Sequence, residues 1–405
     1  MEENEKVKVS LRERVRAFRN PQSRSVDSSL KGALASIMGG ASASGINVTE
    51  ESSLKFSAVW LARRILSELP ASLPIDVFEE KGNNRTSIDH EVKHLLTNPN
   101  MMMNSFTWHE LMNDWLQGWG NGVSVIMRTG ARASELIPIH PSSVEPVVEK
   151  GRIFYKIDDK DMDVKGTFFA EEVVHFKMFT SNGMWGRGPI QMAKDNIGLG
   201  LAAERFGSTF FKKGGNIKAV IEATGFLNDK QFKEWKKRWD DFYSGESGDM
   251  STPVLEHGMS YKPLGIAPEA AQFLQTRQFS VVDIARWFNL PPHMLADLSR
   301  STFSNIEHQD LQLIKYTLRP ILKREETELE NKLLQPKDRG RLKIRYNLDA
   351  LLRGDLASVT NHIKEMVLSG VLCPDEGRAL LNKNPRPGGS DYYTPANIIG
   401  NSQKP

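Results

Sequence analysis

Cysteine and long apolar runs are nearly absent from this chain of 405 residues, and each absence excludes a class of protein. The single cysteine, Cys373, excludes an intramolecular disulfide and fits a reducing compartment. No window approaches the roughly 18 consecutive apolar residues that a membrane-spanning helix needs. The charged residues 1–20 lack the apolar core of a secretory signal, so we expect no membrane partner.

An excess of charge of one sign is also missing. Lys and Arg number 53 against 50 Asp and Glu, which gives a net charge of +3. This balance excludes the strongly cationic field of a typical nucleic-acid-binding domain, so any DNA contact is expected to be local or loose. The length exceeds that of most single domains and predicts two or three of them.

The common signatures of catalytic and cofactor sites are missing too. The sequence has no Rossmann fingerprint, no GxSxG turn, no EF-hand loop and no CxxC pair. Gly214 and Gly215, followed by Lys218, come after a predicted helix and before a predicted strand, the reverse of a phosphate-binding loop. We therefore expect no catalytic residue, no cofactor, no metal and no ATP site.

One motif argues the other way. His90, Glu91 and His94 have the form HExxH, which puts two imidazoles on one helical face with a glutamate as base. The motif sits at the very start of a short helix, Lys93 would place a cation beside the metal, and position 100 is Asn rather than a third His. A surface helix with two histidines is the better interpretation, and a zinc peptidase is kept as an alternative.

Periodicity divides the first half of the chain into helices followed by strands. Residues 1–50 mix charge with Gly and Ser and are expected to form a flexible arm. Alternation of apolar and polar residues over 123–177, broken by turn sequences, predicts an antiparallel sheet covered on one face by helices. A first α+β domain over about 50–190 follows. Its other expected elements are a helix over 54–69 ended by Pro70, a strand over 73–82, a helix capped by Asp89 and running to Leu96, and a helix begun by Thr107 and Glu110 and ended by Gly118 and Gly120.

The second half is dominated by long amphipathic helices around a small insert. A helix is expected over 189–213, then a strand–helix–hairpin insert, then a helix from Pro268 towards Phe288. The longest helix is expected to start at Ser304 and to kink near 316–319, because Pro320 removes one backbone hydrogen bond. A strand over 342–347 and helices over 355–370 and 374–383 close the ordered part.

Several segments in a fixed order along the chain resemble those of a known protein family, and together they are more specific than any single motif. They include AVWLARRILSELPASLPIDVF, WGNGVSVIMR, LIPIHPSSV, GRGPIQMAKDNIGLGLAAERFGSTFFKKG, LNDKQFKEWKKRW, AQFLQTRQFSVVDIARWFNLPPHMLADLSRSTFSNIEHQ, YTLRPILKREETELENKLL and NLDALLRGD. In this order, over 54–384, they resemble the HK97-type family of bacteriophage portal proteins.

The resemblance implies an α+β portal-type subunit that assembles into a ring, typically a dodecamer, at one capsid vertex. Double-stranded DNA would pass through the ring during packaging and ejection. The regions it implies are an N-terminal arm (1–50), an α/β wing (51–188), a two-helix stem (189–215 and 268–295), a small α/β clip (216–267), a tunnel loop (296–304), a long kinked tunnel helix with a returning wing strand (305–347), a helical crown (348–384) and a tail (385–405).

The same resemblance implies the partners and the place of action. The partners would be further copies of the chain, the major capsid protein and scaffold, the large terminase subunit, a head–tail adaptor and DNA bound without sequence specificity. The place would be the virion, after assembly in the host cytoplasm. A near-neutral chain fits this role, because tight phosphate contacts would resist the sliding of DNA. A sequence-independent DNA-binding protein is the other alternative, and it would bind tightly as a monomer.

Two groups of candidate site residues follow from this mapping. The tunnel-loop candidates combine small polar side chains with one cation and would face DNA: Ser299, Arg300, Ser301, Thr302, Phe303 and Ser304. The clip candidates form a mixed-charge helical face that would meet terminase or adaptor: Lys233, Lys236, Lys237, Arg238, Asp240 and Asp241.

Overall fold

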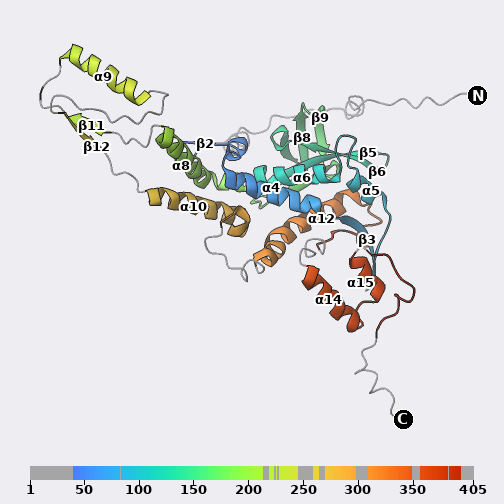
Figure 1. The fold of residues 1–405 in the computed structure, drawn as a ribbon. Coiled ribbons are helices and arrows are strands. Elements are labelled where there is room, and N and C mark those ends of the chain that lie inside the picture. The colour runs from blue at the N-terminus through green and yellow to red at the C-terminus, as the bar shows by residue number, and fades with distance from the viewer. Residues whose placement is uncertain are drawn as a thin grey trace, which may run out of the picture.

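The chain forms a mixed body of helices and sheets from which two long helices lead side by side to a small outlying unit (Figure 1). A pair of short helices lies beside the body towards the C-terminus (Figure 1). The mixed class of helices and sheets expected from the sequence is confirmed. The computed structural model describes residues 40–82, 84–212, 219–222, 225, 228–244, 259–263, 270–297, 309–348, 356–381 and 383–393.

Two helices packed together, α4 (Ser57–Ser72) and α6 (Ser105–Trp119), form the centre of the body. The short helix α3 (Glu50–Ser53) precedes them and is capped by Thr49. The prediction that Pro70 ends the first helix was wrong, because Pro70 lies inside α4. Proline removes only its own N–H, so the chain stays helical until Leu73, whose backbone is extended.

Two other predicted helix starts were displaced by better caps. Helix α5 (Glu91–Thr97) begins after His90, not Asp89, because the His90 ring accepts the Val92 N–H at 3.2 Å. Helix α6 begins two residues before Thr107, because the Asn104 side chain accepts the Thr107 N–H at 2.9 Å. The predicted end at Gly120 is confirmed: its φ is +76°, and a Cβ there would lie 2.4 Å from the Gly188 nitrogen.

The period-two region folds as two antiparallel sheets, so the expectation of one sheet was wrong. A 3₁₀ turn (Pro141–Ser143) leads from the first sheet to the second, and the last strand of the region returns to the first sheet. The two sheets share one apolar cluster around Val123, Val144 and Ile157. The other face of the first sheet, with Ile126 and Leu136, joins α4 and α6 in the main core. The sheets have the orders β10-β5-β6 and β7-β8-β9, from β5 (Asn121–Thr129), β6 (Arg132–Ile139), β7 (Val144–Glu149), β8 (Arg152–Asp159), β9 (Val164–Phe169) and β10 (Val173–Lys177).

A third sheet joins the start of the body to its end. The order is β13-β3-β4, in which β3 (Ile75–Lys81) pairs with both β4 (Asn84–Ser87) and β13 (Leu342–Tyr346). Residue Ile344 lies opposite Val77, so the late strand predicted from the sequence is part of the first domain. A small pair, β1 (Gly40–Ala41) and β2 (Asn47–Val48), falls within the expected N-terminal arm, whose residues 1–39 lie outside the described chain.

The two long helices that leave the body are α8 (Lys194–Lys212) and α10 (Ala270–Trp287), and they pack against each other. The predicted helix 189–213 is interrupted at Ala193, whose ψ is 9°, so that α7 (Pro189–Met192) stands apart from α8. The outlying unit at their far end contains β11 (Ala219–Glu222), α9 (Asp229–Ser244) and β12 (Ser260–Pro263) (Figure 1). Strands β11 and β12 pair antiparallel, which agrees with a compact insert between the two helices.

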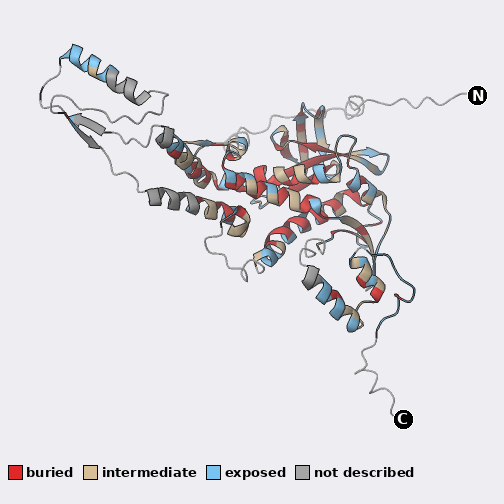
Figure 2. Cartoon of the chain, viewed as in Figure 1, coloured by how far each residue is buried: buried red, intermediate tan, exposed pale blue. Residues whose placement is uncertain are grey.

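Close to the place where a kink was predicted, 316–319, the helix changes type. Residues 309–312 are α-helical, Leu313–Leu318 form a π-helix, and α12 (Arg319–Leu333) continues to the end. The predicted start at Ser304 lies outside the described residues. Figure 2 shows the buried residues concentrated in the body, where α4, α6 and α12 meet. The remaining elements are the 3₁₀ turns Ala170–Glu172 and Pro292–Leu295 and the helices α14 (Leu356–Leu368) and α15 (Pro374–Leu380).

Candidate functional site

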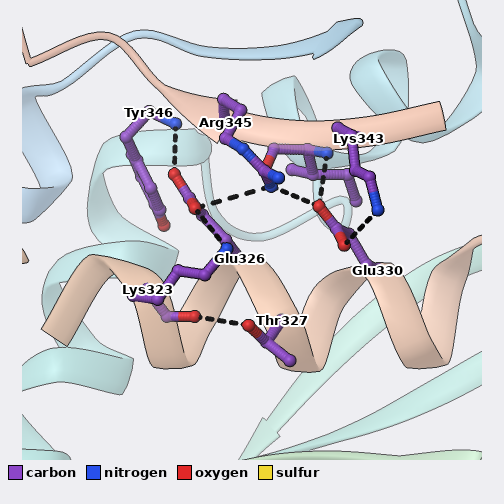
Figure 3. Close-up of polar contacts among 8 residues, drawn as sticks. Lys323, Glu326, Thr327, Glu330, Lys343, Arg345 and Tyr346 are labelled. Carbon is purple, nitrogen blue, oxygen red and sulfur yellow. Dashed lines mark hydrogen bonds and ion pairs between the residues drawn. The ribbon is translucent and has the colours of Figure 1, made fainter. Parts of the chain in front are cut away.

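Helix α12 lies between the free edges of two sheets and carries a row of glutamates that we call the α12 glutamate row (Glu326, Glu328 and Glu330). Towards β13, Glu326 accepts the Tyr346 N–H and Glu330 accepts the Ile344 N–H, each at 3.1 Å (Figure 3). Four residues of helix rise about 6 Å and two residues of strand span about 6.7 Å, so the two spacings match. The row therefore completes the hydrogen bonding of an edge strand.

The same row also holds the other sheet. Glu328 accepts the N–H of His175 in β10 at 3.1 Å, and Lys332 donates to the Ala170 carbonyl just before that strand. On the β13 side, Arg345 pairs with Glu326 at 3.5 Å and hydrogen-bonds Glu330 (Figure 3). An edge strand without partners is a site of unwanted pairing. These contacts place α12 between β10 and β13, where its side chains cover both edge strands.

A buried polar cluster lies behind α12. Tyr346 donates its hydroxyl to Glu325 Oε2 at 2.5 Å, and the His109 ring lies 3.2 Å from the same hydroxyl. Burial raises the pKa of Glu325 to about 7, and burial lowers the pKa of His109 to about 4. Both shifts favour the uncharged form of the side chain, because burial penalises charge.

A shallow concavity of about 420 Å³ lies between β10 and α12. Its charged side chains are three cations and one carboxylate, so it suits an anionic group better than an acid–base reaction. The residues that line it are His175, Phe176, Lys177, Pro320, Lys323, Arg324, Thr327 and Glu328.

The HExxH residues do not form a metal site. The His90 ring caps its own helix, Glu91 pairs with Arg132 at 3.0 Å, and His94 Nε2 lies 2.9 Å from Asp89 Oδ1. Among the described residues, no three His, Cys, Asp or Glu side chains are placed to hold a metal ion. Of the helices that the structure describes, none has the length and apolar character to cross a membrane.

The clip candidates lie together on α9. Lys233, Lys236 and Lys237 are exposed there, at the far end of α8 and α10 (Figure 2). Arg238, Asp240 and Asp241 belong to the same helix, and their side chains are outside the described part of the chain. All the tunnel-loop candidates, Ser299, Arg300, Ser301, Thr302, Phe303 and Ser304, lie outside the described residues.

The sequence predicts an apolar stripe on the helix 189–213 that includes Met192 and Phe206, but it does not show that part of this stripe is exposed. Leu199 and Phe206 on α8 are 47% and 51% exposed, and Met192, seven residues earlier, is 48% exposed. Leu199 and Phe206 are seven residues apart on one continuous helix and share a helical face, so their spacing was a readable signal. Phe279 on the neighbouring α10 is 58% exposed. Exposed apolar side chains that gather on one surface often mark a binding site.

Comparison with protein families gives one match across most of the chain, to the family described as "Phage portal protein", over residues 57–382. The portal protein of Enterobacteria phage HK97 is 31% identical over 373 residues, which cover 89% of this chain and 87% of that protein. A probable portal protein of Streptomyces phage phiC31 is 30% identical over 388 residues, covering 91% and 84%.

Solved structures share the fold at lower identity. An HK97 family phage portal protein from Corynebacterium diphtheriae superposes with a TM-score of 0.58 at 16% identity, covering 76% of this chain and 98% of that one. A chain from the neck of an empty gene transfer agent particle gives 0.57 at 18% identity, covering 83% and 94%.

Proposed function

This chain belongs to the phage portal protein family, and from that premise we propose that its copies form a ring, typically of twelve, at one vertex of a phage-type capsid. The ring is the channel through which double-stranded DNA enters and leaves. The role is structural, with no reaction catalysed by the chain itself. The single observation that carries the ring is the family match over residues 57–382, and the exposed Leu199 on α8 and Phe279 on α10 offer apolar side chains for contacts between copies.

The regions implied by the family map onto the described elements with few changes. The body built on α4, α6 and the three sheets is the wing, α8 and α10 are the stem, and β11, α9 and β12 are the clip. The π-helix and α12 are the tunnel helix, and α14 and α15 are the crown. The position of the stem between body and clip (Figure 1) supports this assignment.

The charge of the chain supports a conduit rather than a clamp. With 53 basic and 50 acidic residues, the ring would hold DNA without a large number of fixed phosphate contacts. The exposed lysines Lys233, Lys236 and Lys237 on α9 would face terminase during packaging and a head–tail adaptor afterwards. The major capsid protein and scaffold would surround the ring in the virion, which is assembled in the host cytoplasm.

The test is the mass of the purified protein by light scattering, together with negative-stain images. The parent protein is expected to form particles of about twelve chains with a central hole. The double variant Leu199→Glu/Phe206→Glu should lower the mass to small oligomers, because it places charges on the exposed apolar face of α8. Val148→Glu is the matched control, since Val148 is equally exposed, at 50%, but lies on β7 of the wing.

Some rings need a capsid protein or scaffold to nucleate, so the measurement is repeated with those proteins present. A chain that stays monomeric under both conditions contradicts the ring. An assembly that survives the double variant contradicts the role of the apolar face of α8 while leaving the ring in place.

A further inference from the structure

The turn from stem to tunnel helix contains a π-helix whose existence follows from one proline. Pro320 has no N–H, so the carbonyl four residues earlier, that of Tyr316, has no α-helical donor. The Arg319 N–H reaches back five residues to Ile314, which is the π-helical pattern. A π-helical turn accommodates one more residue than the α-helical turn it replaces.

The donor that Pro320 lacks comes from Asn289, just beyond the end of α10. Asn289 Nδ2 donates to the Tyr316 carbonyl at 3.0 Å, and the Thr317 hydroxyl donates to the Asn289 carbonyl at 2.5 Å. Asn289 has a φ of +54°, a conformation that asparagine tolerates better than most residues. Its backbone is therefore shaped to present both its amide and its carbonyl to the π-helix.

A second anchor holds the helix about two turns earlier. His293 Nδ1 lies 2.5 Å from Gln309 Oε1, and His293 Nε2 lies 3.1 Å from Asp310 Oδ1. Both anchors are on the segment that follows α10, and both grip residues 309–317. They flank residues 298–308 in sequence, so they fix where that segment enters the tunnel helix.

The sequence around the π-helix is compatible with two registers. Relaxation of the π-turn to an α-turn would rotate residues 309–312 by about 100° and shift them by about 1.5 Å relative to α12. The place of buried Leu313 would then be taken by Ile314, another apolar residue that already packs against the core. Asp310 would replace Gln309 beside His293, so a hydrogen-bond acceptor would still face the imidazole of His293.

We propose that Asn289 is a positioning residue that holds residues 313–318 in the π register, and that the helix has a second, α-helical register which becomes populated when this hydrogen bond is lost. The consequence for DNA passage rests on the proposed function, because the register sets the orientation from which the tunnel loop starts.

The test uses the full chain and three variants. Asn289→Asp keeps the shape and the tolerance for positive φ but cannot donate to the Tyr316 carbonyl. Asn289→Gly keeps the backbone conformation and removes the side chain altogether. Thr317→Ser is the conservative control, because it keeps the hydroxyl that donates to Asn289.

Two readouts distinguish a change of helical register from a mere loss of rigidity in residues 313–318. Disulfide trapping compares two pairs. His293→Cys/Gln309→Cys fits the present register, in which His293 contacts Gln309 and Asp310. His293→Cys/Leu311→Cys fits the α register, in which Asp310 and Leu311 would take these two places. Both pairs are made in a Cys373→Ser background. Loss of one neutral hydrogen bond should raise the ratio of 293–311 to 293–309 cross-links about fivefold in Asn289→Asp and Asn289→Gly, and leave it unchanged in Thr317→Ser. Amide exchange over 313–320 is measured on the same variants without the added cysteines.

A ratio that does not move overturns the second register, and faster exchange with an unmoved ratio would mean that Asn289 only pins the helix. Exchange and ratio that both stay at the parent values overturn the positioning role. DNA packaging is assayed in parallel. A shifted ratio with normal packaging leaves the register inference standing and counts against its role in DNA passage.

Discussion

The body of this protein and its two long helices α8 and α10, the proposed stem, differ in how completely their apolar side chains are buried. In the body, the side chains of α12 complete the edges of two sheets, and Trp108, Met112 and Leu116 of α6 are fully buried. On α8, Leu199 and Phe206 leave about half of their surface in solvent. The core of the body is buried within one chain, whereas under the proposed function the exposed apolar side chains of the stem would be covered by another copy. The comparison teaches that folding and assembly draw on different parts of this sequence.

The largest expected difference comes from the same substitution in the two regions. Leu116→Ala removes a side chain with no exposure and should lower the free energy of unfolding by about 2–5 kcal/mol. Leu199→Ala should change it by less than about 0.5 kcal/mol. Urea denaturation is measured under conditions where both variants have the same mass as the parent. Equal losses would mean that the stem face is already covered within the chain.

The next effect is a pH dependence that comes from the buried polar cluster behind α12. The folded pKa of Glu325, about 7, is above its ordinary value of 4.5, so the stability it contributes is complete below about pH 4.5 and is lost as pH rises through 7. Glu325→Gln stays neutral and should gain up to about 3 kcal/mol over the parent at pH 8 relative to pH 4. Thermal unfolding of both proteins across this range checks the sign, and a constant difference would contradict it.

A smaller effect is expected at the α12 glutamate row. Glu330→Leu leaves the Ile344 N–H and the Arg345 guanidinium without an acceptor at this position and should cost about 2 kcal/mol. Glu68→Leu is the control, because Glu68 makes an exposed pair with Arg64 on α4, and exposed pairs of this kind contribute little to stability. Denaturant titration compares the free energies of unfolding of the two variants. Similar losses would contradict a stabilising role of the α12 glutamate row.

The smallest expected effect on stability comes from deleting residues 300–304. The deletion should leave ring assembly intact and impair DNA packaging or retention, because these residues would project small polar groups and Arg300 towards the channel. Imaging of the ring and a packaging assay check the two halves of the prediction. Normal packaging by the deleted protein would mean that the loop neither grips nor gates DNA.

Local signals predicted the elements well and their caps less well. Gly120 ended its helix as expected, because its requirement for positive φ is a property of that residue alone. Pro320 marked the change of helix type because its missing N–H is likewise a property of that residue alone. The starts at Asp89 and Thr107 were wrong because His90 and Asn104, both close by, competed for the same backbone donors. The HExxH reading failed because each of its side chains has a different partner.

The sequence by itself determined the mixed fold class, the positions of most helices and strands, and the family, since these depend on local periodicity and on the order of segments along the chain. Tertiary structure alone decided that the period-two region splits into two sheets, that β13 returns to β3, and that the α12 glutamate row closes both edges. It also decided that Asn289 would replace the donor missing at Pro320. In these cases the partners lie far apart in sequence, and a hydrophobic pattern specifies which face is buried but not which distant element covers it.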